Sequence, residues 1–196
     1  MAPIVVGISG ASGTILGLKC CKTLLEHGFR VDLVFSKHAF ETARCEIEGS
    51  YSGIDDLVAS FCGKNDRLAV YFHDDMTAPI ASGSYVTQGM IVIPCSMATC
   101  AAISIGLSDT LLRRACDVMI KEKRKLVIVP RETPLSEIHL ENLLKLTRLG
   151  VHIVPPMVAW YTKPKTVDEV ENFIVGRALE ALGISLLLYP RWEGKK

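Results

Sequence analysis

The stretch "IVVGISGASGTILGLKCCKTLLEHG" (residues 4–28) decides the fold of this chain. It opens with a short β-branched run, passes through a turn made of Gly, Ala and Ser, and continues with apolar residues at helical spacing. Gly28 closes the helical pattern, as a glycine commonly does. The pattern therefore predicts a strand, a tight turn and a helix.

The rest of the chain repeats this alternation. We expect further strands at residues 30–36, 68–73, 89–95, 125–130 and 151–156, and helices within residues 37–48, 96–124, 136–149 and 166–183. Ser108 and Asp109 are expected to break and cap the stretch 96–124, whereas residues 49–67 give no clear prediction. Such alternation predicts an α/β fold: an open, mostly parallel sheet with helices on both faces, in three layers, with ligands at the carboxyl ends of the strands.

Composition favours one soluble domain. The 196 residues are 49% apolar, enough to bury a core without metal or disulfide staples, so we expect a single domain over residues 1–196 with a separate tail from about residue 184. The net charge of +1 favours neither nucleic acid nor an anionic membrane as a partner. The seven cysteines lack zinc-site spacing and CxxC pairs, and the sequence lacks a secretory signal, so we expect reduced thiols, no metal site and a cytoplasmic location.

Three turns suit a phosphate ester. Glycines in "GISGASG" (residues 7–13) let backbone N–H groups approach an anion at a helix N-terminus, although a GxxGxxG spacing alone also fits a dinucleotide fold or a turn without ligand. The second strand ends in Ser36 and Lys37, where a dinucleotide site usually has Asp or Glu, which favours FMN over NAD and leaves NADP open. Ser96 and Thr99 in "PCSMAT" open a later helix, and the three turns are expected to converge on one crevice.

Several longer motifs resemble a known family. They are "GISGASG", "APIASGSYVTQGM", "PCSMAT", "LLRRACDVMIKEKRKLVIVPRETPL", "IHLENLLKL" and "PPMVAWYTKP", and the resemblance runs from residue 4 to about residue 192. Together they are similar to the successive motifs of the flavin prenyltransferases of the UbiX type. The resemblance implies a flavodoxin-like fold, a homo-oligomer that is usually a dodecamer, and transfer of a dimethylallyl group from dimethylallyl phosphate to N5 and C6 of reduced FMN. The prenylated FMN would serve a UbiD-type decarboxylase.

The resemblance also implies site residues. The flavin side would comprise Gly10, Ala11, Ser12, Ser36, Ser96, Thr99 and Arg114. The side that binds dimethylallyl phosphate would comprise Ser84, Lys121, Arg131, Tyr161, Arg177 and Trp192, and Arg177 could come from the same or a neighbouring subunit. The catalytic set would be Glu46, Lys121, Arg131 and Glu132, in which the two glutamates act as acid and base.

The chemistry explains these residue types. Breaking an allylic C–O bond leaves a phosphate dianion and allyl cation character, so cations and hydroxyls placed on the phosphate stabilise charge that grows in the transition state. A carboxylate beside that phosphate can pass it a proton or receive one from the flavin. Asp55-Asp56 and Asp74-Asp75 have no downstream partner of the kind that Mg²⁺-dependent prenyltransferases use, which is consistent with a metal-independent reaction.

Two other functions stay open at this stage. One is an FMN-dependent decarboxylase of the related cysteine-decarboxylase fold, but the chain has "PPMVAW" where those enzymes have a PxMN loop. The other is a flavin-binding protein without catalysis, for which the cationic residues would have no use. Trp160 could face a carbocation or fill a core, Trp192 could cover the site or lie in an exposed tail, and His139 is expected to have a structural role.

Overall fold

The computed structural model describes residues 1–194. Its sheet has six strands in the order β3-β2-β1-β4-β5-β6, and every pairing is parallel. The strands are β1 (Ile4–Ile8), β2 (Val31–Phe35), β3 (Leu68–Tyr71), β4 (Gly89–Cys95), β5 (Leu126–Pro130) and β6 (His152–Ile153). The helices are α1 (Thr14–Glu26), α2 (Ala39–Glu46), α3 (Ile54–Cys62), α4 (Met97–Ser104), α5 (Leu111–Lys121), α6 (Glu137–Arg148) and α7 (Val167–Leu182), with short 3₁₀ helices η1 (Pro79–Ala81) and η2 (Trp160–Thr162).

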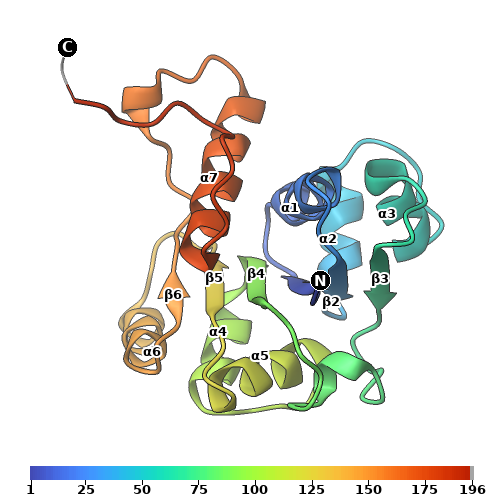
Figure 1. Cartoon of the computed structure of the whole chain (residues 1–196). Coiled ribbons are helices and arrows are strands. Elements are labelled where there is room, and N and C mark those ends of the chain that lie inside the picture. Colours follow the sequence, from blue (N-terminus) through green and yellow to red (C-terminus); the bar gives the residue numbers. More distant parts are fainter. Residues whose placement is uncertain (195–196) are drawn as a thin grey trace.

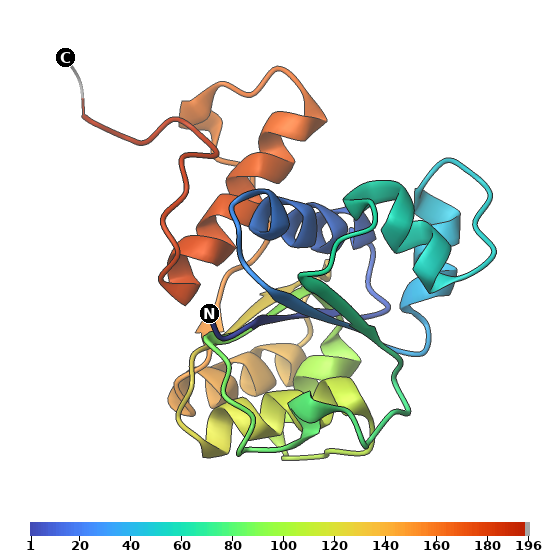
Figure 2. The ribbon, with the colours of Figure 1, turned by 45° about the vertical axis from the view of Figure 1, so that its right-hand side comes forward.

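Helices cover both faces of the sheet. Side chains of α1, α2, α3 and α7 share one buried cluster, and side chains of α4, α5 and α6 share the other (Figures 1 and 2). Along β1, Ile4, Val6 and Ile8 face the first cluster, whereas Val5 faces the second. Strands covered on both faces are expected to be almost continuously apolar, as these are. The predicted open parallel sheet in three layers is confirmed.

Helix α1 lies very close to the sheet because Gly17 has no side chain. A Cβ at this position would lie 2.6 Å from the side chain of Ile8 and would also meet the carbonyl oxygen of Ile93. The close approach fixes the turn between β1 and α1 at the carboxyl edge of the sheet. Gly13 sits in that turn with a φ of 101°, a conformation that glycine adopts readily.

Two details differ from the sequence-based expectations. Residues 49–67, which gave no clear prediction, contain α3, whose apolar residues Leu57 and Val58 are buried against the core. Ser108 and Asp109 lie in the expected break between α4 and α5, but the expected cap is wrong, because α5 begins after Thr110 and Asp109 instead pairs with Arg113 at 2.7 Å. A carboxylate paired with an arginine four residues further along the chain is less available to cap the helix.

The chain ends in an arm beside α7. Residues 155–166 lead away from the sheet to the start of α7, and the tail (residues 184–194) runs back along α7 from its C-terminal end (Figure 1). Gly183, with a φ of 102°, ends α7 and lets the tail turn back, as expected from the sequence. Among residues 1–194, no helix combines the length and apolar character that crossing a bilayer requires.

Candidate functional site

A crevice of about 370 Å³ lies at the carboxyl edge of the sheet. It is lined by Gly10, Ser36, Lys37, His38, Ser96, Ala98, Thr99, Thr110, Leu112 and Arg113. The turns that follow β1, β2 and β4 each contribute to this lining, as the sequence predicted for three phosphate-friendly turns. The lining combines hydroxyl groups with two cationic side chains, which is a suitable donor set for an anion.

Ser9 holds two of these turns together. Its fully buried hydroxyl donates to the carbonyl oxygen of Pro94 at 2.9 Å and accepts the N–H of Ser96 at 2.7 Å. Ser96 in turn caps α4, accepting the N–H of Thr99 at 3.2 Å, and the two hydroxyl oxygens are 3.0 Å apart. The hydroxyl groups at the end of β4 are therefore fixed in place.

Some lining residues were missed from sequence. Thr110 and Arg113 reach the crevice from the start of α5, and Ser9 supports it from β1. The signal available for Thr110 was its place directly before an apolar helix, where a capping residue is expected. Nothing in the local pattern marked Arg113, because its position depends on how α5 packs.

Gly10 leaves room where two turns meet. A Cβ at Gly10 would lie 3.1 Å from Cβ of His38, so any larger residue would push the turns apart. Ala11 is buried and Ser12 is half-buried in the same turn, beside the crevice and not in its lining. The turn can therefore present backbone groups closely to a ligand.

Glu46 lies at the start of α1. Its carboxylate accepts the N–H of Gly13 at 2.9 Å and the N–H of Thr14 at 3.1 Å. The N-terminus of a helix carries partial positive charge and free N–H groups, so a carboxylate from α2 is stabilised there. The contact places Glu46 next to Ser12, although the two are far apart in sequence.

Arg131 and Glu132 line a second cavity at the same edge of the sheet. This cavity has a volume of about 380 Å³ and is otherwise lined by Thr133 and by prolines and apolar residues: Pro130, Leu135, Leu143, Pro155, Pro156 and Met157. The backbone N–H of Arg131 donates to Cys95 at 3.0 Å, one residue before Ser96 of the crevice. Glu132 accepts the N–H of Thr133 at 3.0 Å. Both side chains are exposed at the mouth of the cavity.

Ser84 and Lys121 lie together at the opposite edge of the sheet. Helix α5 starts at the crevice, has 11 residues and is therefore about 16 Å long, so Lys121 at its end is far from Thr110 at its start. Gly83 lets Lys121 approach the loop, since a Cβ there would lie 2.6 Å from Nζ of Lys121. The hydroxyl of Ser84 is 2.9 Å from that of Ser82.

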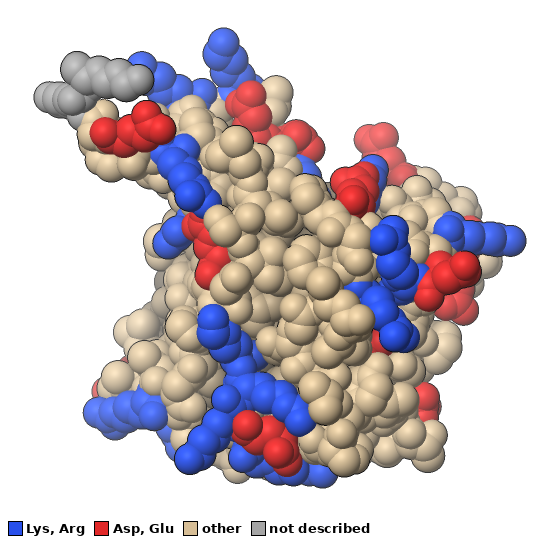
Figure 3. Space-filling model, viewed as in Figure 1, with Lys and Arg blue, Asp and Glu red and all other residues tan. Residues whose placement is uncertain are grey.

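Arg114 and the basic end of α5 belong to the same region. Nε of Arg114 donates to the carbonyl of Ala81 at 3.0 Å, and its Nη1 pairs with Asp117 at 2.8 Å. Figure 3 shows Lys and Arg side chains gathered over α5, with acidic side chains among them. Arg114 is not part of the crevice lining, so its predicted contact with the flavin is not made from the same cavity.

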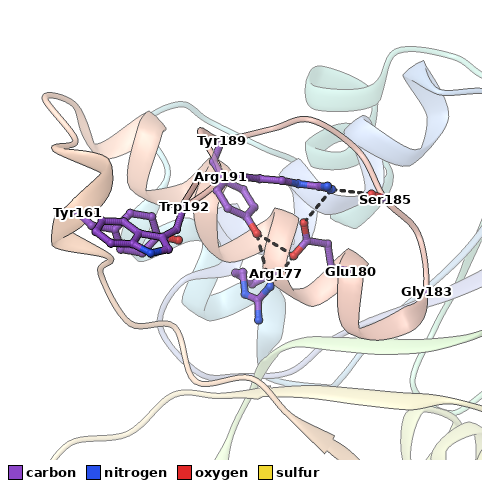
Figure 4. A pocket seen from close by; sticks show the side chains of 8 residues that line it. All are labelled: Tyr161, Arg177, Glu180, Gly183, Ser185, Tyr189, Arg191 and Trp192. Carbon is purple, nitrogen blue, oxygen red and sulfur yellow. Dashed lines mark hydrogen bonds and ion pairs between the residues drawn. The ribbon is translucent and has the colours of Figure 1, made fainter. Parts of the chain in front are cut away.

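Tyr161, Arg177 and Trp192 meet in a third cavity, in the arm. This cavity has a volume of about 520 Å³ and is also lined by Glu180, Gly183, Ser185, Tyr189 and Arg191 (Figure 4). The rings of Tyr161 and Trp192 pack edge to face with centroids 5.4 Å apart. Trp160 points away from any core, with 78% of its surface exposed. The sequence-predicted donor residues are thus divided among three places in one chain.

His139 and the buried Cys20 have structural roles. His139 accepts the N–H of Ser136 at 3.2 Å through Nδ1 and completes a capping box at the start of α6, which is the structural role that was expected. All seven cysteines are free. Burial raises the pKa of Cys20 to about 12, so this thiol is protonated at neutral pH and is not a nucleophile. Within residues 1–194, no cluster of His, Cys, Asp or Glu could hold a metal ion.

Comparison with known proteins identifies the family. The model of the Flavoprotein family matches residues 1–179. The flavin prenyltransferase UbiX of Halalkalibacterium halodurans is 49% identical over 193 residues, which cover 95% of this chain and 91% of that protein. The chain belongs to the Flavoprotein family, and within it to the flavin prenyltransferases of the UbiX type.

Solved structures of this family have the same fold. The crystal structure of AnUbiX (PadA1) in complex with FMN and dimethylallyl pyrophosphate is 42% identical, with a TM-score of 0.89, over 100% of this chain and 99% of that chain. A dodecameric FMN-dependent UbiX-like decarboxylase from Escherichia coli is 45% identical, also with a TM-score of 0.89, over 98% of this chain and 100% of that chain. A cypemycin decarboxylase at 17% identity shares the fold alone.

Proposed function

We propose that this protein is a flavin prenyltransferase, which transfers a dimethylallyl group from dimethylallyl phosphate to N5 and C6 of reduced FMN. One observation carries the proposal. The hydroxyl- and cation-lined crevice at the carboxyl edge of the sheet occurs in a chain that is 42% identical, over its full length, to a protein crystallised with both FMN and dimethylallyl pyrophosphate. Ligand sites at the carboxyl edge of parallel sheets are the rule for this fold class.

The crevice suits the flavin phosphate. Its volume of about 370 Å³ lies in the range of small-molecule sites, and Ser36, Ser96 and Thr99 offer hydroxyl groups at the ends of two strands. Lys37 and Arg113 supply positive charge, and Gly10 leaves space for a ligand near the backbone. Ala11 and Ser12, in the adjoining turn, would face the ring system. When bound, reduced FMN supplies the nucleophilic atoms of the reaction.

The donor phosphate needs cations and hydroxyls. Arg131 lines the second cavity at the same edge of the sheet as the crevice, and we assign it, together with Lys121 and Ser84, to the phosphate of the donor. These groups would stabilise the negative charge that grows on the phosphate as the allylic C–O bond breaks. Tyr161 and Arg177 would contact the same phosphate, and Trp192 would shield it from water.

Two carboxylates flank the proposed reaction centre. Glu46 is fixed at the start of α1 beside Ser12, while Glu132 is exposed next to Arg131. We therefore assign to Glu132 the exchange of a proton with the leaving phosphate, and to Glu46 an exchange with the flavin side. Neither step requires a metal ion.

A complete site requires several copies of the chain. Ser84 and Lys121 lie at one edge of the sheet, the crevice at the other, and Tyr161, Arg177 and Trp192 in the arm. A homo-oligomer, as in the dodecameric relative, would bring these three regions of different subunits together. Exposed apolar side chains on α6, including Ile138, Leu140 and Leu144, support such assembly.

Two further assignments follow from the family. The product would be consumed by a UbiD-type decarboxylase. Seven free cysteines suit a reducing compartment, so we assign the protein to the cytoplasm.

The test is anaerobic incubation with FMN, dithionite and dimethylallyl phosphate in the absence of Mg²⁺, followed by mass spectrometry of the released flavin. A gain of one C5H8 unit establishes the transferase. FMN that stays bound but unmodified in two separate incubations, one with the monophosphate and one with the pyrophosphate, overturns the proposal. Loss of CO₂ from a cysteine-terminated peptide incubated with oxidised FMN, without dithionite, would favour the decarboxylase alternative instead.

A further inference from the structure

The arm is organised around Glu180, a residue of α7 to which neither the sequence motifs nor the family resemblance assigned a role. Its carboxylate accepts hydrogen bonds from Nη1 of Arg177, from the hydroxyl of Tyr189 at 2.7 Å and from Nη2 of Arg191 at 3.3 Å (Figure 4). Only 18% of its side chain is exposed. One carboxylate therefore links the helix to two separate residues of the tail.

The tail is built to lie on this part of α7. Gly176 leaves space for Tyr189, because a Cβ there would lie 2.7 Å from the Tyr189 ring. The same ring packs edge to face on Phe173 with centroids 4.7 Å apart. Arg191, besides its bond to Glu180, donates to the hydroxyl of Ser185 at 2.6 Å. The tail thus has a specific binding surface with Glu180 at its centre.

Charge balance favours this arrangement. Two guanidinium groups share the single carboxylate of Glu180. Burial opposes ionisation of that carboxylate, but hydrogen bonds from Tyr189 and Arg177 and the charges of both arginines outweigh it and lower its pKa. Hydrogen bonds that involve a charged partner are the strong ones in proteins. The carboxylate is therefore ionised whenever the enzyme works near neutral pH.

We propose that Glu180 is a positioning residue for the prenyl transfer, which holds Arg177 in a fixed orientation and keeps the tail seated so that Tyr161 and Trp192 stay paired. This inference rests on the proposed function, because Arg177 is taken to bind the donor phosphate. Within residues 1–194, every hydrogen bond of the Arg177 side chain uses Nη1. Nε and Nη2 remain for an incoming phosphate, in a planar geometry that suits two parallel hydrogen bonds.

The expected effect is on donor binding. A guanidinium that is already oriented loses less freedom when the phosphate arrives, so removing its orienting partner weakens binding without altering the chemical step. Glu180→Gln should raise KM for dimethylallyl phosphate about tenfold and leave kcat and FMN affinity within about twofold. Amide hydrogen exchange in residues 184–192 should become faster in the same variant.

A matched control lies on the same helix. Glu171 is a carboxylate of α7 with the same 18% exposure, but it pairs with Lys19 of α1 and not with the tail. Glu171→Gln should leave both KM and tail exchange unchanged. Tyr189→Phe retains the ring on Gly176 and removes only the hydroxyl, so it should reproduce part of the effect even if Glu180→Gln folds poorly.

The outcomes separate this inference from the proposed function. An unchanged KM in Glu180→Gln, an equal rise in Glu171→Gln, or a fall in kcat with KM unchanged overturns the positioning role. If the wild-type protein forms no prenylated FMN, the proposed function fails. Amide exchange then still shows whether Glu180 holds the tail, because that measurement needs no activity.

Discussion

The crevice at the sheet edge and the arm beside α7 are built by different means. The crevice stands on buried strands and on contacts between backbone and small side chains, such as the two hydrogen bonds of Ser9. The arm is held by exposed aromatic rings and by charged groups around Glu180. A rigid support suits atoms that must be aligned for bond formation, whereas a segment held at the surface can open to admit a substrate.

This contrast assigns different kinetic roles to the two regions. Groups at the crevice and its edge should control the chemical step, because the proposed function assigns the bond changes to this region. Groups in the arm should control donor binding. Substitutions in each region should therefore change different kinetic constants.

Replacing Glu132 should affect the chemical step most. Glu132→Gln retains the size of the side chain and removes its ability to carry a proton, so kcat should fall by about 100-fold to 10,000-fold. FMN should still bind with unchanged affinity, measured by flavin fluorescence titration. Single-turnover mass spectrometry of the flavin product gives the rate. Glu141→Gln, an exposed carboxylate of α6, is the control and should have no effect.

Loss of flavin binding in Glu132→Gln would contradict this role. An effect on KM alone would move Glu132 into the same class as the arm residues. Glu132 would then give no support for a difference in kinetic role between the crevice and the arm.

Alanine substitutions at two helical glycines, Gly17 and Gly176, compare the rigidity of the sheet region with that of the arm. Gly17→Ala places a Cβ 2.6 Å from Ile8 and against the backbone of β4, neither of which can move easily, so it should destabilise the protein by about 1–3 kcal/mol. Gly176→Ala meets only the ring of Tyr189 in the tail, and the tail can shift, so the cost should be less than about 1 kcal/mol. Thermal denaturation at one fixed protein concentration measures both. Equal losses would show that the arm is as rigid as the sheet.

The fold was predictable because its signals are local. Strands such as "GMIVIPC" are short apolar runs, and caps such as Thr166 and Gly183 mark helix ends within a few residues. The convergence of Ser36, Ser96 and Thr99 followed from topology alone, since parallel strands bring their carboxyl ends to one edge. Helix α3 was missed because its surroundings are polar and no residue of its N-terminus forms a side-chain cap.

The site was predictable only in part. Glu180 and Arg113 owe their positions to packing between distant segments, which no local pattern reveals. The family resemblance indicated Ser84 and Lys121 as site residues, but it did not show that they lie at the edge of the sheet opposite the crevice. Their separation became clear only when the direction of α5 was known. Sequence motifs thus identified residue types, and the structure shows which of them one chain can bring together.

Ser12 should affect flavin binding moderately. Ser12→Ala removes one hydroxyl from the turn beside the crevice, and a single hydrogen bond to a ligand is worth about 0.5–1.5 kcal/mol, so FMN affinity should fall about fivefold. Stability should not change, because Ser12 is half-buried and makes no side-chain hydrogen bond within residues 1–194. Calorimetric titration with FMN measures the affinity, with the exposed Ser50→Ala as control. An unaltered affinity would remove Ser12 from the flavin side.

The smallest expected effect is on the stability of the protein at alkaline pH, through the buried thiol of Cys20 in α1. Burial raises the pKa of Cys20 to about 12, against about 8.5 for a free thiol. Over the pH range between these values, the thiol stays protonated in the folded protein and loses its proton in the unfolded chain. The contribution is constant below about pH 8.5, and above it the free energy of unfolding should fall by about 1.4 kcal/mol per pH unit for this thiol. Urea denaturation at several pH values between 8 and 10 gives the free energy of unfolding at each pH. This free energy should fall less steeply with pH in Cys20→Ala than in the wild type, whereas Cys45→Ala, at an exposed position, should behave as the wild type does. If the free energy of unfolding falls equally steeply with pH in all three proteins, water reaches Cys20. The packing of α1 on the sheet would then open as readily as the arm.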